Sequence, residues 1–382
     1  MTKKILFIFG TRPEAIKMAP LIKEVEKHKD FEAKICVTAQ HRQMLDQVLK
    51  IFDIRPDYDL NIMTNNQSLF EITAKIIVRM QDVIAREKPD IVVVQGDTTT
   101  TFAASLAAFY MRTVVVHLEA GLRTGNKFAP FPEEINRRIT STIADIHLAP
   151  TPWAKDNLLK ENIPPDNIFV TGNTVIDALF HVAEKLKTTG SNFDGHFDGI
   201  DFSRRVVLIT GHRRENFGEG FKNICNAIRD LAAKFTDAEF VYPVHFNPNV
   251  RKPVNEILRG FKNVHLTEPL GYEPFVYAME KCYLILTDSG GVQEEAPSLG
   301  KPVLVMRETT ERPEAVEAGT VKLVGTDRKK IVDNVSMLLT DSKEYLAMSR
   351  AHNPYGDGKA SRRIVKIFED YFKRESIGKI GK

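Results

Sequence analysis

The sequence ILFIFGTRPEAIK, residues 5–17, has the order of a buried β-strand, a turn and the start of an α-helix. Ile5–Phe9 is apolar at every position, as is typical of a strand that is covered on both faces in a parallel sheet. Gly10 ends the run, and Pro13 stands where proline commonly opens a helix. A strand that leads directly into a helix is the repeating unit of doubly wound α/β folds.

The same unit recurs along the chain. Further strand candidates are Ile35–Thr38, Ile91–Gln95, Val114–Leu118, Ile168–Thr171, Val206–Thr210, Glu239–Val244, Val264–Leu266, Leu284–Thr287 and Val303–Met306. Helix candidates between them include Ala15–Lys27, Leu69–Glu87 and Phe221–Lys234. This alternation predicts an α/β protein with two doubly wound, Rossmann-like domains that face a cleft.

The series of strands is interrupted at about residues 172–204, where Gly, Asp and Asn gather as they do in surface connections. We therefore expect a first domain over residues 1–172 and a second over residues 173–358. A helix within residues 359–382 would follow and could pack back on the first domain. The length of 382 residues agrees with two domains of roughly 100–200 residues each.

Composition narrows the classes of function. Lys and Arg number 53 and Asp and Glu 50, a formal charge of +3, which argues against binding to nucleic acid or to a membrane surface. Cys36, Cys225 and Cys282 are too far apart for a disulfide framework or a thiolate metal cluster, and they suit a reducing cytoplasm. The apolar run at the N-terminus is too short for a signal peptide. We expect a cytoplasmic protein.

Ligands of doubly wound sheets bind beyond the carboxyl ends of the strands. The turn after Ile5–Phe9 lacks the three glycines of a dinucleotide site, but Arg12 and Lys17 supply cations that could hold phosphate near a helix start. The alternative is a good helix start with Arg12 in solvent.

Carboxylates follow two other strands of the first domain. Asp97 and Glu119 stand at strand ends, and Glu133 lies shortly afterwards in a loop-like segment. Gathered together they could perform acid–base catalysis, or they could be helix caps and surface charges. A metal site built from Asp97, His117 and Glu119 ranks third, because no compact metal-binding motif is present.

The second domain offers an anion site. Ser289, Gly290 and Gly291 follow a strand, so their backbone could approach a diphosphate, although an ordinary strand-to-helix turn fits as well. Glu295, one turn later, could take ribose hydroxyls. Other candidates near strand ends are His212, Arg213, His245 and Arg312. Arg312 begins a second copy of the Arg-Pro-Glu-Ala motif that starts at Arg12.

Together these phrases form a recognisable set. They are GTRPEAIKMAP (10–20), QGDT (95–98), HLEAGLR (117–123), FPEE (131–134), GHRREN (211–216), DSGG (288–291) and TERPE (310–314). From its first strand to its last helix, the chain resembles the non-hydrolysing UDP-N-acetylglucosamine 2-epimerases of bacteria. The resemblance implies a GT-B-like fold, a homodimer, no cofactor and no catalytic metal. It also implies interconversion of UDP-N-acetylglucosamine and UDP-N-acetylmannosamine through release of UDP and a 2-acetamidoglucal, for surface polysaccharide synthesis.

The resemblance also assigns roles to residues. The acid–base candidates are Asp97, Glu119 and Glu133, while His212, Arg12 and Lys17 would balance the charge of the departing diphosphate. Residues that would hold the diphosphate and ribose or line the nucleotide pocket are Ser289, Gly290, Gly291, Glu295, Phe275 and Arg312. A second, regulatory UDP-N-acetylglucosamine site would use Gln40, Gln43, Gln67, Glu133, Arg213 and His245, with Asn66 where relatives commonly have arginine.

Three alternatives stay open at this point: a GT-B glycosyltransferase, a hydrolysing epimerase and a nucleotide-sugar sensor without catalytic activity. The carboxylates argue against a sensor, because binding an anionic diphosphate gives no reason to gather negative charge nearby. Which carboxylate acts in which direction does not follow from the sequence.

Overall fold

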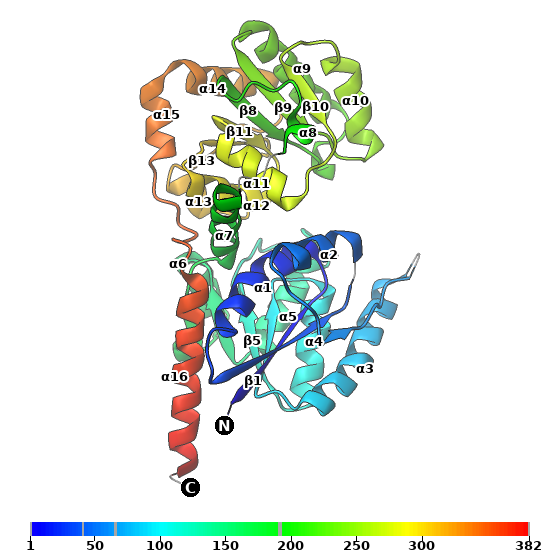
Figure 1. The fold of residues 1–382 in the computed structure, drawn as a ribbon, viewed down its shortest axis with the longest axis vertical. Helices are drawn as coiled ribbons and strands as arrows, with labels where there is room; N and C mark the ends of the chain where they lie inside the picture. The colour runs from blue at the N-terminus through cyan, green and yellow to red at the C-terminus, as the bar shows by residue number, and fades with distance from the viewer. Residues whose placement is uncertain (1, 40–41, 65–66, 190–192, 381–382) are drawn as a thin grey trace. The chain divides into compact units, whose positions relative to one another are not determined.

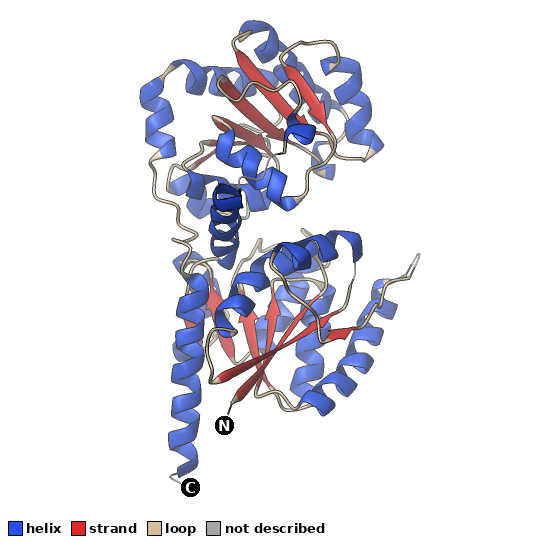
Figure 2. Cartoon of the chain, viewed as in Figure 1, coloured by secondary structure: helices blue, strands red, loops and turns tan. Residues whose placement is uncertain are grey.

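The computed structural model describes residues 2–39, 42–64, 67–189 and 193–380 (Figure 1). The chain forms two compact units, Met1–Ala178 with Tyr355–Lys382 and Leu179–Pro354. Each unit is a parallel sheet with helices packed on it, as Figure 2 shows by colour. The doubly wound α/β class predicted from the sequence is confirmed.

Within the described residues, the sheet of the first unit has seven parallel strands in the order β3-β2-β1-β4-β5-β6-β7. Their bounds are β1 Lys3–Phe9, β2 Phe31–Val37, β3 Tyr58–Asp59, β4 Ile91–Gln95, β5 Val114–Leu118, β6 Ile146–Ala149 and β7 Ile168–Val170. The helices are α1 Arg12–Val25, α2 Arg42–Ile51, α3 Leu69–Glu87, α4 Thr99–Tyr110, α5 Glu133–Ile143 and α6 Pro152–Lys160. Helix α7, Thr174–Thr189, begins in the first unit and continues into the second, which starts at Leu179.

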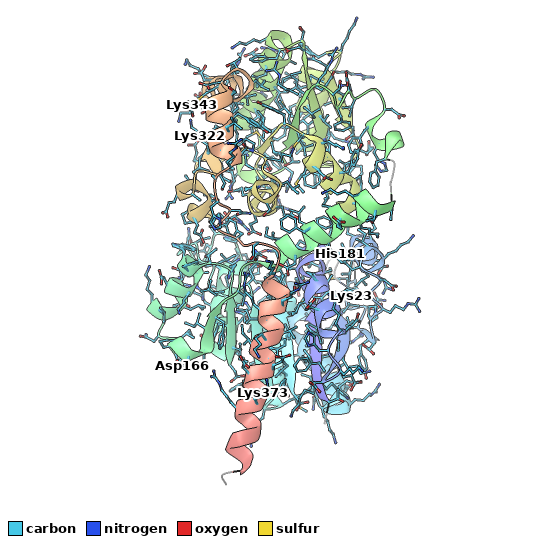
Figure 3. The ribbon with its side chains drawn as sticks, turned by 60° about the vertical axis from the view of Figure 1, so that its left-hand side comes forward. Lys23, Asp166, His181, Lys322, Lys343 and Lys373 are labelled. Atoms are coloured by element: carbon cyan, nitrogen blue, oxygen red, sulfur yellow. The ribbon has the colours of Figure 1, made fainter. Side chains whose placement is uncertain are left out.

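The C-terminal helix, α16 Ala360–Ile380, belongs to the first unit and packs beside α1. Its Phe372 ring lies 6.0 Å from the ring of Phe31, and Arg362 Nε lies 3.8 Å from Glu24 Oε1 of α1. Figure 3 labels Lys373 on α16 and Lys23 on α1. The end of the chain thus completes the unit that the start of the chain begins.

The described part of the second unit has a six-stranded parallel sheet in the order β10-β9-β8-β11-β12-β13. The strands are β8 Arg205–Thr210, β9 Ala238–Pro243, β10 Val264–Thr267, β11 Leu284–Thr287, β12 Val303–Val305 and β13 Val321–Leu323. The helices are α8 Asp194–Phe197, α9 Glu219–Lys234, α10 Pro248–Leu258, α11 Tyr272–Lys281, α12 Gly290–Glu295, α13 Pro313–Glu317, α14 Arg328–Thr340 and α15 Ser342–Ser349.

Burial follows the apolar runs of the sequence. Ile5–Phe9 and Ile91–Val94 are fully buried in the first unit, and Leu284–Leu286 is fully buried in the second. Each predicted run overlaps a strand, with ends that differ by a few residues, whereas β3, β6 and β13 were not predicted. Among the described residues, no helix combines the length and the apolar character needed to cross a membrane.

Candidate active site

Glu119 lies in the turn after β5 and is the most enclosed of the predicted catalytic carboxylates. Its side chain forms an ion pair with Lys17 of α1, and it accepts hydrogen bonds from Gln95 Nε2 and from Asn173 Nδ2, the latter at 3.3 Å. Glu119 is only 7% exposed and has a φ of 64°. One cation and two amides therefore hold this carboxylate in a fixed orientation at the carboxyl edge of the sheet.

Asp97 follows β4 and is held by α5. Its carboxylate pairs with buried Arg137, and its backbone carbonyl accepts a hydrogen bond of 3.0 Å from Asn136 Nδ2. The neighbouring residue, Gly96, lies against Glu119, because a Cβ placed on Gly96 would stand 3.4 Å from Glu119 Oε2. The structure thus brings the Gly96–Asp97 turn, Glu119 and Lys17 together.

His117 is fully buried, and its Nε2 lies 2.8 Å from the carbonyl oxygen of Gly96. Burial lowers the pKa of His117 to about 3, so the ring is neutral and its Nε2–H donates to that carbonyl. The alternative metal site of Asp97, His117 and Glu119 is not formed: the described residues contain no group of three His, Cys, Asp or Glu side chains that could hold a metal ion.

The two adjacent glutamates at the start of α5 have different surroundings. Glu134 is fully buried and accepts backbone N–H groups from Thr124 at 3.0 Å and from Gly125 at 3.2 Å. Glu133 is half-buried at the first position of the helix. Glu134 therefore anchors the preceding loop, which leaves Glu133 as the candidate for chemistry at this helix start.

Arg12 is half-buried at the first position of α1, and the turn before it is fixed by Glu14. Buried Glu14 accepts the backbone N–H of Thr11 at 2.7 Å and the hydroxyl of Thr98 at 2.7 Å, so it links the turn after β1 to the start of α4. Burial raises the pKa of Glu14, and hydrogen bonds from Thr11 and Thr98 oppose the rise. This role of Glu14 was not predicted from the sequence, although Thr11 and Glu14 have the spacing of a capping box.

In the second unit, buried Asp288 organises the loop that carries His212. Its Oδ2 accepts the backbone N–H groups of His212 at 2.9 Å and of Arg213 at 2.8 Å. The ring of His212 stacks on that of His245, with centroids 5.4 Å apart. The pKa of His212 lies below its usual value, chiefly because of burial. The negative charge of Asp288 opposes this shift, whereas His245 and Arg213 add to it.

The Ser289-Gly290-Gly291 turn is supported by Arg312. The guanidinium of Arg312 donates at 2.7 Å both to buried Glu294 and to Glu311, and a Cβ on Gly290 would stand 2.6 Å from Arg312 Nη1. Glycine is therefore required at position 290 for the guanidinium to lie against the turn. Two carboxylates fix Arg312, a contact that the sequence analysis did not predict.

Two further nucleotide-pocket candidates lie near this turn in the chain. Glu295, at the end of α12, accepts a hydrogen bond of 2.8 Å from the hydroxyl of Tyr272 in a buried setting. Phe275 is half-buried on α11, the helix that Tyr272 begins. Tyr272 was not among the predicted site residues.

The predicted regulatory residues are only partly described. Gln40 and Asn66 lie outside the described residues, and Gln43 belongs to α2. Gln67 is half-buried and accepts the N–H of Thr64 at 3.2 Å. In the second unit, Arg213 and His245 both lie beside His212.

The chain has two Rossmann-like units. The first carries two carboxylates that are each paired with a cation, and the second carries a glycine turn next to the Asp288 that holds the His212 loop. These features place the chain in the GT-B-like class. A remote structural likeness to the glycotransferase of kitacinnamycin, with a TM-score of 0.63 at 10% identity over 97% of this chain and 99% of the other, bears on the fold alone.

The sequence model described as UDP-N-acetylglucosamine 2-epimerase matches residues 23–369. The UDP-N-acetylglucosamine 2-epimerase of Escherichia coli K12 is 58% identical over 370 residues, which cover 96% of this chain and 98% of the relative. The crystal structure of UDP-GlcNAc 2-epimerase from Neisseria meningitidis bound to UDP-GlcNAc has a TM-score of 0.90 at 57% identity, covering 96% of this chain and 100% of the other. The chain belongs to the UDP-N-acetylglucosamine 2-epimerase family.

Proposed function

We propose that this chain interconverts UDP-N-acetylglucosamine and UDP-N-acetylmannosamine by inverting the configuration at C2 of the sugar. The single observation that supports this most directly is the clamp on Glu119 by Lys17, Gln95 and Asn173. A carboxylate held in this way at the carboxyl edge of a parallel sheet is oriented for proton transfer. Family membership supplies the substrate class.

The chemistry explains why both carboxylates and cations are needed. The C2 proton is not adjacent to a carbonyl group and has little acidity by itself. In the proposed reaction the C1–O bond breaks with its electron pair moving to UDP, and a carboxylate removes the C2 proton to leave a 2-acetamidoglucal. Protonation of C2 from the opposite face and return of the UDP oxygen to C1 give the epimer, so atoms and charge balance.

Each unit supplies one part of this reaction. Asp97, Glu119 and Glu133 provide the acid–base groups of the first unit, with Arg12 and Lys17 as cations for the diphosphate. In the second unit His212 balances charge on the departing group. The residues proposed to hold UDP there are Ser289, Gly290, Gly291, Glu295, Phe275 and Arg312.

Assembly, location and regulation are also part of the proposal. The free, buried thiols of Cys36, Cys225 and Cys282 suit a reducing cytoplasm, and the family resemblance implies a homodimer that serves surface polysaccharide synthesis. A regulatory UDP-N-acetylglucosamine site would include Arg213 and His245. We expect traces of UDP-N-acetylglucosamine to accelerate turnover of UDP-N-acetylmannosamine, and a rate that does not depend on such traces would contradict the regulatory site.

Turnover in heavy water tests the reaction itself. We expect deuterium at C2 of both epimers, whereas epimerised product without deuterium would contradict the proposed proton transfer. Accumulation of free N-acetylmannosamine would indicate a hydrolysing enzyme instead. Transfer of the sugar to an acceptor would indicate a glycosyltransferase.

Two carboxylate variants separate catalysis from binding. Asp97→Asn and Glu119→Gln should each lower kcat by roughly 10²–10⁴-fold, the usual contribution of a positioned acid or base, while the Kd of UDP changes far less. Asp82→Asn, on the exposed side of α3, is the matched control. Unchanged kcat in both site variants would favour a sensor of nucleotide sugars.

A further inference from the structure

Asp288 follows β11, and its fully buried carboxylate accepts hydrogen bonds from the described residues through only one of its two oxygens. Oδ2 accepts three hydrogen bonds, from the backbone N–H groups of His212 at 2.9 Å and Arg213 at 2.8 Å and from Asn216 Nδ2 at 3.3 Å. These bonds hold the loop after β8 against the end of β11. They account for the backbone position of His212 but not for the other carboxylate oxygen.

The other oxygen, Oδ1, lies 3.6 Å from Nδ1 of His212 and has no hydrogen-bond partner among the described residues. A buried carboxylate oxygen without a donor is costly, so this atom requires an explanation. An approach of roughly half an ångström by the imidazole would bring Nδ1–H into normal hydrogen-bond range. The His212 side chain is 44% exposed, so its ring is not enclosed on every side.

The loop around His212 is otherwise held from several directions. Tyr242 donates at 3.1 Å to the carbonyl of Gly211, and Asn216 donates at 3.1 Å to the carbonyl of Met306 as well as to Asp288. This support fixes the backbone and leaves the orientation of the imidazole to its own contacts. These contacts include Oδ1 of Asp288, 3.6 Å from Nδ1, and the stacked ring of His245.

We propose that Asp288 is a positioning residue for His212: it holds a proton at Nδ1 and thereby presents Nε2 as the atom that meets the departing diphosphate. The proposal rests on the proposed function, in which His212 balances charge on UDP. No bond is made or broken at Asp288. Its carboxylate keeps the Nδ1 proton, and Nε2 takes up a proton from water, so that the resulting imidazolium donates a hydrogen bond to an oxygen of the departing diphosphate.

Among the charged groups that face His212, Asp288 favours the positive imidazole and the others oppose it. Arg213 on the same loop and His245 on the loop after β9 both disfavour a positive imidazole, and burial acts in the same direction. Asp288, on the loop after β11, favours the positive form. Without that carboxylate, His212 would face two basic groups and would lose the interaction that favours its positive form.

The variant Asp288→Asn separates positioning from simple support. Its side-chain oxygen can still accept the N–H groups of His212 and Arg213, so the loop remains held. Its Nδ2 then replaces Oδ1 and donates to Nδ1, which moves the proton of the neutral imidazole to Nε2. Asp333→Asn on the exposed face of α14 makes the same chemical change elsewhere and is the control.

Nuclear magnetic resonance of the imidazole nitrogens measures the effect without turnover. We expect a neutral His212 protonated at Nδ1 in the native chain and at Nε2 in Asp288→Asn, with the pKa of His212 lowered by about 1 or more in the variant. The signal of His212 is assigned by its loss in His212→Asn. An unchanged pKa and tautomer in Asp288→Asn would overturn the proposal.

A native imidazole protonated at Nε2 would also overturn it, and that measurement holds even if the variant does not fold. Kinetics then separate the two proposals. Native turnover by His212→Asn would contradict the role of His212 in the proposed function, yet it would leave the nuclear magnetic resonance result standing. If His212 and Asp288 both have their proposed roles, a fall of about 1 in the pKa of His212 in Asp288→Asn lowers kcat about tenfold. The Kd of UDP should change less.

Discussion

Replacing Gly121 with alanine should destabilise the first unit severely. Gly121 lies in the turn that follows Glu119 and has a φ of 92°. A Cβ there would stand 2.1 Å from the carbonyl oxygen of Ala154 and 3.1 Å from Cγ of Leu158, both in α6. A left-handed conformation costs a non-glycine residue about 1–2 kcal/mol, and forced overpacking costs about 1–3 kcal/mol more. We therefore expect a loss of about 2–5 kcal/mol in the free energy of unfolding.

Gly125 provides the matched control, because it has a φ of 77° and no atom within 4 Å of an added Cβ. Gly125→Ala should cost only the conformational part, about 1–2 kcal/mol. Trp153, the single tryptophan of the chain, packs on the cluster that contains Ala154, so its fluorescence during urea unfolding reports on this region. Equal destabilisation by the two substitutions would refute the steric argument. Because the displaced turn carries Glu119, Gly121→Ala should also lower kcat.

Two further predictions concern a nucleotide contact and acid sensitivity. Tyr272→Phe removes the 2.8 Å hydrogen bond to Glu295, so we expect UDP to bind about fivefold more weakly, a loss of about 1 kcal/mol. Calorimetry measures this affinity, and the control variant Tyr345→Phe should bind UDP as the native chain does. Burial lowers the pKa of His117 from 6.5 to about 3. As the pH falls, the unfolded chain therefore binds a proton at this residue before the folded chain does, and the free energy of unfolding decreases between pH 6.5 and about 3. His117→Asn should therefore flatten the decline of unfolding free energy below pH 6.5 by up to about 1.4 kcal/mol per pH, whereas exposed His352→Asn should not.

The sequence predicted the sheets well where strands are apolar throughout. Ile5–Phe9 is the clearest case, because continuous burial leaves a continuous apolar run. Strand β6 was missed because His147 interrupts its apolar residues, yet the ring is buried with its pKa lowered to about 4 by burial. Strand β13 contains Lys322, and β3 has only the two residues Tyr58–Asp59. Short or interrupted strands depend on neighbours that the local pattern does not contain.

The strand-end rule identified candidate residues but not their partners. It singled out Asp97 and Glu119, because parallel strands present their carboxyl ends at one edge. The rule does not predict the ion pair of Lys17 with Glu119, which are 102 positions apart in the sequence. Nor does it predict the ion pair of Arg137 with Asp97, which are 40 positions apart. Such pairs depend on how helices pack on the sheet. The same reason explains why Asp288 stood in a quoted motif without a predicted role.

The two units compensate charge in different ways, and this difference bears on their proposed roles. In the first unit Glu119 and Asp97 each contact a cation directly, so their orientation is set before a ligand arrives. In the second unit His212 lies 3.6 Å from one oxygen of Asp288, and Arg213 and His245 oppose its positive form. A nearby negative charge favours the protonated form of a histidine, and this acts against the burial that lowers the pKa of His212. In the proposed reaction, a diphosphate beside His212 would therefore favour protonation of the imidazole as charge develops on the leaving oxygen, and the paired carboxylates would keep their geometry for proton transfer at C2.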